Sequence, residues 1–288
     1  MPFFSIIIPT YNREKTIIRA IDSVLQQSFT DFEIIVVDDG SVDATKEVVS
    51  SLYDNRIHYY YQANQGVCAA RNYGASLASG DYLIFLDSDD YVTTNWLEDF
   101  YNIKDYNYDI IFCQMKRIDK KYPNGFVVNP KDKKFGAMGN GIVIPGAFMI
   151  KKIIFDKVGG YDESLFYAEN TELFFRINKL KPSRFFIDKV NFIYYPSEYG
   201  GSKNLMNMII SNKIILEKHD DWLSNKIKYT YHQIIAVNYT RFDDQRNAAF
   251  HFLKAIKYNP FKLGTYIRYL ISKSSYLRSV FYKLNFKK

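Results

Sequence analysis

Apolar residues run without interruption at three places in the first ninety residues. The runs are short enough for strands and cover residues 4–8, 32–37 and 82–86. A strand buried on both faces has apolar side chains in both directions, so its sequence is continuous rather than alternating. A further strand is predicted over 57–61, and apolar residues at helical spacing predict helices over 14–27, 42–52 and 66–79. Strands that alternate with helices indicate an α/β fold with a mostly parallel sheet.

The pattern is less regular in the middle of the chain. Strands are predicted over 109–115, 184–187 and 192–195, a loop or hairpin over 122–141, and a helix from Glu169. From about Asn204 the spacing is helical to the end of the chain. We therefore expect an α/β domain over residues 1–203 and a helical extension over 204–288.

Composition excludes several classes of protein. No run reaches the roughly 18 apolar residues of a membrane-spanning helix. The first residues lack the basic leader of a signal peptide, and two cysteines, Cys68 and Cys113, suit a reducing compartment, so we expect a cytoplasmic protein. The four histidines show no zinc-ligand spacing.

Carboxylates follow two of the predicted strands directly. Asp38 and Asp39 end one apolar run, and Asp87, Asp89 and Asp90 end another. Open α/β sheets bind ligands at the carboxyl ends of their strands, so these side chains are expected to lie in one crevice. The spacing of Asp87, Ser88 and Asp89 suits a divalent cation that holds phosphates, whereas turns that merely contain aspartates are the alternative.

Two common phosphate-binding loops are missing from the sequence. The first strand is followed by Pro9, Thr10, Tyr11 and Asn12 rather than by Gly-x-Gly-x-x-Gly, and no Walker loop is present. Phosphate charge would then be met by a metal and by basic side chains. Arg71 is a candidate, and its alternative is an arginine on a helix surface.

Four motifs occur in order: SIIIPTYNR, VVDDGS, NQGVCAARNYG and FLDSDD. In these motifs the chain resembles the family 2 glycosyltransferases with the GT-A fold, over about residues 3–200. The resemblance implies an inverting transferase that uses a nucleotide-diphosphate sugar, UDP-sugar favoured, with Mg²⁺ or Mn²⁺. It also implies a saccharide or lipid-linked acceptor and a role in bacterial surface polysaccharide synthesis.

The resemblance also implies roles for residues of these motifs. Pro9, Tyr11 and Asp39 would hold the base and ribose, and Arg71 would support base or diphosphate. Asp87, with Ser88 beside it, would serve the ribose and the metal, and Asp89 and Asp90 would complete the metal site.

The general base is the point at which the chain departs from this family. The family base is usually the Asp of a Glu-Asp pair at the start of a late helix, where this chain has Glu169 and Asn170. An amide cannot accept the proton, so the base is Glu169, or Glu172 or Asp162, or the protein is weakly active or inactive. A sugar-nucleotide-binding protein without turnover, a retaining transferase and a nucleotidyltransferase therefore remain alternatives.

The end of the chain is strongly basic. No acid follows Asp244, and ten Lys and Arg residues lie in 245–288, so the net charge of +7 leaves −3 for residues 1–244. Apolar residues of this tail fall on one helical face: Leu263, Tyr266, Ile267, Leu270, Leu277, Phe281 and Leu284. One interpretation is a helix packed by this face on the catalytic domain with a solvated basic side, and the other is a helix on the anionic inner face of a membrane. A nucleic-acid partner is not expected, because no such module is present.

Overall fold

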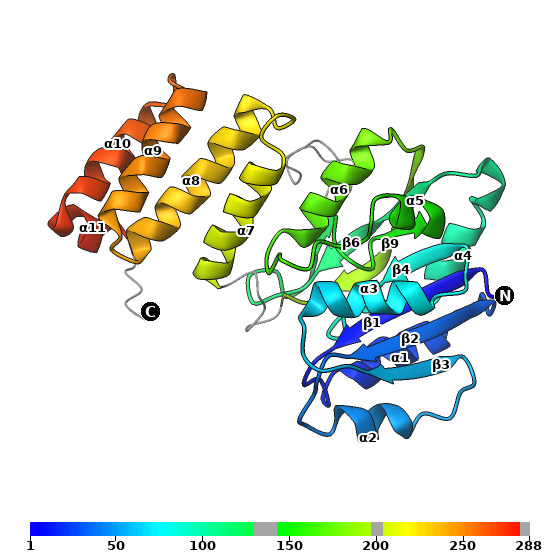
Figure 1. The fold of residues 1–288 in the computed structure, drawn as a ribbon. Helices are drawn as coiled ribbons and strands as arrows, with labels where there is room; N and C mark the ends of the chain where they lie inside the picture. The colour runs from blue at the N-terminus through cyan, green and yellow to red at the C-terminus, as the bar shows by residue number, and fades with distance from the viewer. Residues whose placement is uncertain (130–142, 197–203, 283–288) are drawn as a thin grey trace. The chain divides into compact units, whose positions relative to one another are not determined.

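The structure is a computed structural model that describes residues 1–129, 143–196 and 204–282. Within these residues a nine-stranded mixed sheet has the order β3-β2-β1-β4-β8-β6-β9-β5, and β7 pairs with β6 (Figure 1). Its strands are β1 (Phe4–Thr10), β2 (Phe32–Asp38), β3 (Ile57–Tyr61), β4 (Tyr82–Phe85), β5 (Tyr91–Val92), β6 (Ile110–Arg117), β7 (Phe126–Val128), β8 (Phe148–Lys151) and β9 (Arg184–Tyr194).

The amino-terminal half of the sheet is parallel. β1 pairs with β2 on one side and with β4 on the other, and β2 pairs with β3, all in the same direction. The four strands predicted from continuous or near-continuous apolar runs are confirmed. Parallel pairing places the carboxyl ends of β1, β2 and β4 at one edge of the sheet.

The other half of the sheet is mixed. β8 runs antiparallel between β4 and β6, while β6 and β9 are parallel. The prediction of two short strands over 184–187 and 192–195 was wrong, because β9 is a single strand. The register of its pairing with β6 shifts around Gln114. This irregularity in the pairing interrupts the apolar pattern of the sequence, although the strand itself continues. β7 pairs antiparallel with β6 in the region expected to be a loop or hairpin, and residues 130–142 of that region lie outside the described residues.

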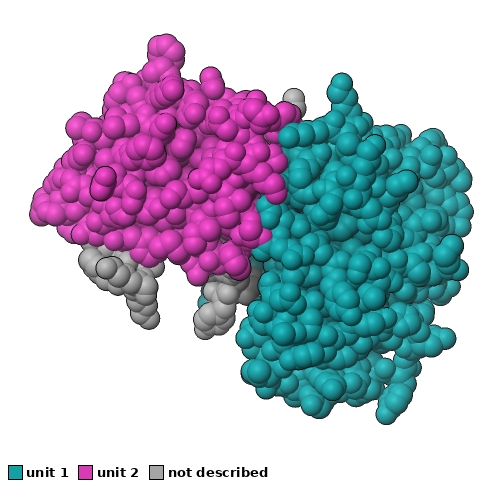
Figure 2. Space-filling view, viewed as in Figure 1, with its two compact units in different colours: residues 1–163, 169–198 teal, residues 164–168, 199–288 magenta. Residues whose placement is uncertain are grey.

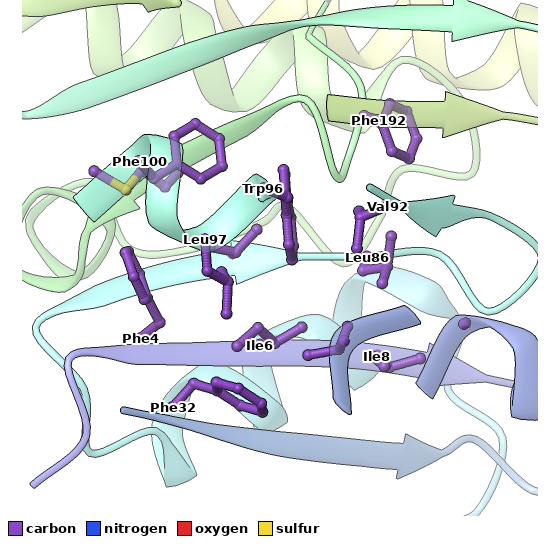
Figure 3. Close-up of a cluster of buried hydrophobic side chains, with 14 of the residues drawn as sticks. Phe4, Ile6, Ile8, Phe32, Leu86, Val92, Trp96, Leu97, Phe100 and Phe192 are labelled. Atoms are coloured by element: carbon purple, nitrogen blue, oxygen red, sulfur yellow. The ribbon is translucent and has the colours of Figure 1, made fainter. Parts of the chain in front are cut away.

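Helices cover both faces of the sheet. On one face lie α1 (Ile17–Leu25), α2 (Thr45–Ser50) and α4 (Trp96–Tyr101), whose apolar side chains join one buried cluster (Figure 3). On the other lie α3 (Val67–Leu77), α5 (Lys152–Lys157) and α6 (Glu169–Lys179), in a second cluster. A short 3₁₀ helix, η1 (Lys104–Tyr106), precedes β6. α4 and α5 were not predicted, since six residues are too few for a clear helical period.

The β1 strand shows why its sequence is apolar at every position. Ile6 and Ile8 point into the first cluster, whereas Ile7 points into the second. Successive side chains of a strand alternate between faces, and both faces here are covered by helices. The continuous apolar run is therefore the signature of a central strand in a three-layer fold.

The chain divides into two compact units, which Figure 2 colours separately. The first comprises 1–163 and 169–198, and the second comprises 164–168 and 199–288. In the second unit each helix contacts the next along the chain: α7 (Leu205–Lys218), α8 (Asn225–Arg241), α9 (Gln245–Tyr258), α10 (Leu263–Lys273) and α11 (Ser275–Phe281). Side chains of Asn204, Asp244 and Ser274 accept backbone N–H bonds and so cap three of these helices.

None of the helices in the described ranges combines the length and the hydropathy that crossing a lipid bilayer requires.

Candidate active site

The carboxyl ends of three parallel strands bring the sequence motifs together. The Asp39 N–H donates to the Thr10 carbonyl at 2.8 Å, which joins the ends of β2 and β1. The Leu86 N–H donates to the Ile7 carbonyl at 3.0 Å, which joins the end of β4 to β1. Pro9, Asp39 and Asp87, predicted from separate stretches of sequence, therefore follow neighbouring strands at one sheet edge.

The two aspartates after β2 organise loops. Asp38 accepts the Ser41 N–H at 2.8 Å and the Tyr59 hydroxyl at 2.6 Å. Asp39 is buried and accepts the backbone N–H groups of Gln65 and Gly66, both at 2.8 Å. These bonds fix the entry of α3, where the amide groups at a helix start face anions favourably.

Gly40 lies between these loops in a conformation that other residues rarely adopt. Its φ is +86°, and an added Cβ would come within 2.9 Å of the Asn64 backbone nitrogen. The Asp-Gly turn is therefore required by a close approach between two loops. Beside it, Tyr11 is exposed, and the Asn12 N–H donates to the Ser41 hydroxyl at 2.8 Å.

The acidic loop after β4 presents several carboxyl groups and a buried hydroxyl. Ser88 and Asp90 are buried. Asp90 accepts the Tyr195 N–H at 2.8 Å through one oxygen, and within the described residues its other oxygen has no hydrogen-bond partner. Burial raises the pKa of both Asp89 and Asp90, and the negative charge of Asp87 raises each further. A cation would relieve this crowding of like charge.

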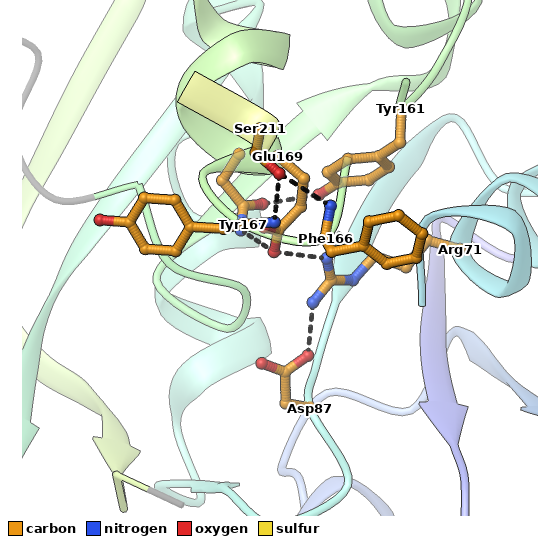
Figure 4. A network of polar contacts seen from close by, with 8 residues as sticks. Arg71, Asp87, Tyr161, Phe166, Tyr167, Glu169 and Ser211 are labelled. Atoms are coloured by element: carbon orange, nitrogen blue, oxygen red, sulfur yellow. Dashed lines mark hydrogen bonds and ion pairs between the residues drawn. The ribbon is translucent and has the colours of Figure 1, made fainter. Parts of the chain in front are cut away.

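Arg71 links the acidic loop to the start of α6 (Figure 4). Its guanidinium donates to Asp87 at 2.7 Å and to Glu169 at 3.1 Å, although Glu169 is 98 residues away in sequence. The side chain is 3% exposed, so the alternative of a surface arginine is excluded. Burial lowers the pKa of Arg71, but the carboxylates of Asp87 and Glu169 and the phenol of Tyr161 outweigh it and keep the group charged.

Tyr161 and Asn170 were not predicted as site residues, yet they support Glu169. The Arg71 guanidinium lies 5.2 Å from the centre of the Tyr161 ring, and the Tyr161 hydroxyl donates to the Asn170 side chain at 2.9 Å. Asn170 in turn donates to Oε1 of Glu169 at 3.0 Å. The Gly159–Gly160 turn, visible in the sequence, was the only signal for Tyr161, because the turn carries it into the site.

Glu172, the other predicted carboxylate, has a different environment. Its side chain is 0% exposed and is bonded by Arg176 of the same helix through contacts of 2.7, 2.9 and 3.0 Å. Glu169 is 18% exposed. Glu169 therefore lies partly exposed beside Arg71, whereas Glu172 is enclosed and paired with Arg176.

The peptide just before α6 belongs to the helical unit. The backbone N–H groups of Phe166 and Tyr167 both donate to the buried Ser211 hydroxyl of α7 at 3.1 Å (Figure 4). Ala168 then has a φ of +59°, a value that few residues other than glycine adopt. The residue that precedes Glu169 is therefore in an uncommon backbone conformation.

Similarity to solved structures shows the fold. Staphylococcus aureus TarS 1-349, solved in complex with UDP-GlcNAc, superposes with a TM-score of 0.67 at 21% identity, over 97% of this chain and 92% of that one. The mannosyltransferase PcManGT of Pyrobaculum calidifontis, solved with GDP-Man and Mn²⁺, superposes with a TM-score of 0.59 at 16% identity, over 97% and 86%. The fold is that of the GT-A glycosyltransferases, as predicted.

Sequence similarity then identifies the family. The model of glycosyl transferase family 2 matches residues 5–159, more than half of the chain. An uncharacterized glycosyltransferase of Rickettsia prowazekii is 32% identical over 79% of this chain and 72% of its own length. One of Rickettsia typhi is 36% identical over 61% of this chain and 58% of its own, so the match spans less than two thirds of that relative. The chain belongs to glycosyl transferase family 2.

Proposed function

We propose that this glycosyltransferase inverts configuration as it moves a sugar from a nucleotide-diphosphate donor, UDP-sugar favoured, to a saccharide or lipid-linked acceptor. The proposal places it in cell-surface polysaccharide synthesis, with residues 1–203 as the catalytic domain. The observation that carries it is the Arg71 bridge, which joins the acidic loop at Asp87 to a carboxylate at Glu169. The bridge supports the proposal that a donor-binding motif and a candidate base share one site.

The nucleotide would lie along the shared strand edge. Pro9 lies near the end of β1, which pairs with β2, and the exposed Tyr11 just after β1 offers a ring for the base. Asp39 would act by holding the Gln65–Gly66 backbone in place and by accepting from base or ribose, since a carboxylate has about four acceptor positions. The TarS complex with UDP-GlcNAc supports a uridine donor.

A divalent cation, Mg²⁺ or Mn²⁺, fits the acidic loop. Asp87 and Asp89 supply hard oxygen ligands, and Asp90 has an oxygen without a partner among the described residues. In those residues no three His, Cys, Asp or Glu side chains form a ready-made metal cluster, so donor phosphates would complete the coordination. When bound, the cation would neutralise charge on the leaving diphosphate.

Glu169 would take the proton of the acceptor hydroxyl. Arg71 and Asn170 both donate to its Oε1, and no hydrogen bond in the described part of the chain engages Oε2. Oε1 thus orients the carboxylate and Oε2 accepts the proton as the acceptor oxygen attacks the anomeric carbon. Attack opposite the leaving diphosphate inverts the configuration.

Asn170 then has a positioning role at the place where the family has its base. Its amide holds Glu169, and Tyr161 holds the amide. The enclosure and pairing of Glu172 by Arg176 favour Glu169 further, since proton transfer requires contact with the acceptor.

The test is release of nucleoside diphosphate from a panel of sugar nucleotides, with and without acceptor extract and divalent cation. We expect one donor to be turned over faster with acceptor, and the anomeric configuration of the product to be inverted. Retained configuration would show a retaining transferase. Tight binding of one donor without any release would show a binding protein. The ion pair between Arg71 and Glu169 would then have a structural role only.

A further inference from the structure

Helix α10 has its apolar side outward, the reverse of a helix packed on a core. Leu263, Ile267 and Leu270 are 75%, 58% and 63% exposed. Thr265 and Ser272 are 1% and 0% exposed. Spacings of three, four and seven residues keep each set on one face of the helix, and the two faces are opposite. The interpretation of this helix as packed by its apolar face was therefore wrong for α10.

Hydrogen bonds fix the inward face of α10. The Thr265 hydroxyl lies 3.0 Å from the Tyr229 hydroxyl and accepts the Gln233 side-chain amide at 2.9 Å. Arg268 donates to the Gln233 side-chain oxygen at 3.1 Å. Turning the helix to bury its apolar face would leave these polar groups without their partners, which is unfavourable for groups that are buried. The outward apolar face is thus set by specific contacts with α8.

The exposed apolar surface extends beyond α10. α11 contacts α10 and adds exposed residues of its own, as does the turn before α10. These additional exposed residues are Phe261, Tyr276, Val280 and Phe281. Soluble proteins rarely leave so many large apolar side chains of neighbouring elements exposed, so these residues indicate a binding surface.

The charge around this surface identifies the partner. Lys262 and Lys273 lie at the two ends of α10 and are exposed, and no acid follows Asp244 in the chain. Asp243, the residue before Asp244, forms an ion pair with Arg278 at 2.7 Å. A second copy of the chain docked through a two-fold axis would bring like charges together, because the same patch meets itself. Apolar side chains surrounded by lysines suit an anionic bilayer surface instead.

We propose that α10 and α11 form a docking face for an anionic phospholipid membrane, with Leu263, Ile267 and Leu270 inserted among the acyl chains. The protein would then lie peripherally on the membrane and act where a lipid-linked acceptor is presented. Only this last step rests on the proposed function, since docking requires no turnover.

The test compares three proteins in vesicle co-sedimentation: the wild type, Leu263→Ser/Ile267→Ser/Leu270→Ser, and a matched control. The control, Tyr53→Ser/Tyr106→Ser/Ile153→Ser, removes three apolar side chains of similar or greater exposure from the first unit. With vesicles of phosphatidylcholine and phosphatidylglycerol, we expect the α10 variant to partition at least about tenfold less than wild type, and the control to match wild type. Binding should weaken with salt and in pure phosphatidylcholine.

Two outcomes would overturn the proposal. One is equal partitioning of the wild type and the α10 variant. The other is a concentration-dependent dimer of the wild type that the α10 substitutions abolish, which would identify a second copy as the partner. Circular dichroism checks that the variants fold. Donor turnover in detergent-free solution should be unchanged by the α10 substitutions, so failure of the catalytic proposal is visible separately.

Discussion

Two glutamates on one helix allow a matched experiment on the general base. Glu169 and Glu172 lie three residues apart at the start of α6, and glutamine replaces either with little change of shape. Glu169→Gln removes a carboxylate beside Arg71, whereas Glu172→Gln removes one that is enclosed by Arg176. The proposed mechanism requires opposite consequences for turnover and stability.

Glu169→Gln should reduce turnover and leave the fold intact. Loss of a general base lowers the rate by about 10²–10⁴-fold, or roughly 3–5 kcal/mol of transition-state stabilisation. The glutamine oxygen can still accept from Arg71 and Asn170. Because Arg71 keeps its ion pair with Asp87, the loss of free energy of unfolding should be smaller than that of Glu172→Gln.

Glu172→Gln should act on stability. Its carboxylate is wholly buried and takes three contacts from Arg176, so the substitution leaves a cation without its counter-charge. Breaking a buried pair in this way costs about 3–5 kcal/mol, and the lower end applies because Arg176 is partly exposed. Such a loss is a large part of the roughly 5–15 kcal/mol that keeps a protein folded.

Three measurements separate the two variants: release of UDP with acceptor extract, calorimetric binding of UDP, and thermal unfolding. Glu169→Gln should bind UDP as the wild type does, unfold at nearly the same temperature and turn over slowly. Turnover within tenfold of wild type in this variant would remove Glu169 from the role of base. A well-folded Glu172→Gln protein with the larger loss of turnover would transfer that role to Glu172.

Three further predictions concern packing, pH and metal. Gly74→Ala places a Cβ 2.6 Å from a methyl of Ile7, so thermal unfolding should show a loss of about 1–3 kcal/mol, and an unchanged transition would refute the tight packing of α3 on β1. Burial lowers the pKa of both His232 and His251 from 6.5 to about 4, with nearby lysines adding to the shift. Between pH 4 and pH 6.5 the unfolded chain therefore binds more protons than the folded one, so the stability should be full above pH 6.5 and fall towards pH 4. His232→Asn/His251→Asn should flatten this pH dependence when denaturant midpoints are measured across the range. EDTA should lower turnover at least about tenfold and Mn²⁺ or Mg²⁺ should restore it, whereas EDTA-insensitive turnover would contradict a metal at the acidic loop.

Much of the parallel half of the sheet was readable from sequence, because its strands are central. β1, β2 and β4 are apolar on both faces, and carboxylates lie at the ends of β2 and β4. Parallel strands must end at a common edge, so the neighbourhood of Asp39 and Asp87 followed from local pattern alone. The antiparallel half was harder, since the β9 strand has an irregular register and the helices α4 and α5 are short.

What the sequence determined by itself was therefore the α/β order, the family, and the positions of the donor motifs. Tertiary structure decided which distant groups meet them. Arg71 reaches Glu169 across 98 residues, and Arg176 encloses Glu172 on the same helix that presents Glu169. Likewise, the periodicity of α10 gave an apolar face, but only its contacts with α8 turned that face outward. Periodicity shows that a helix has an apolar face, whereas long-range contacts orient the helix and determine whether that face is buried or exposed.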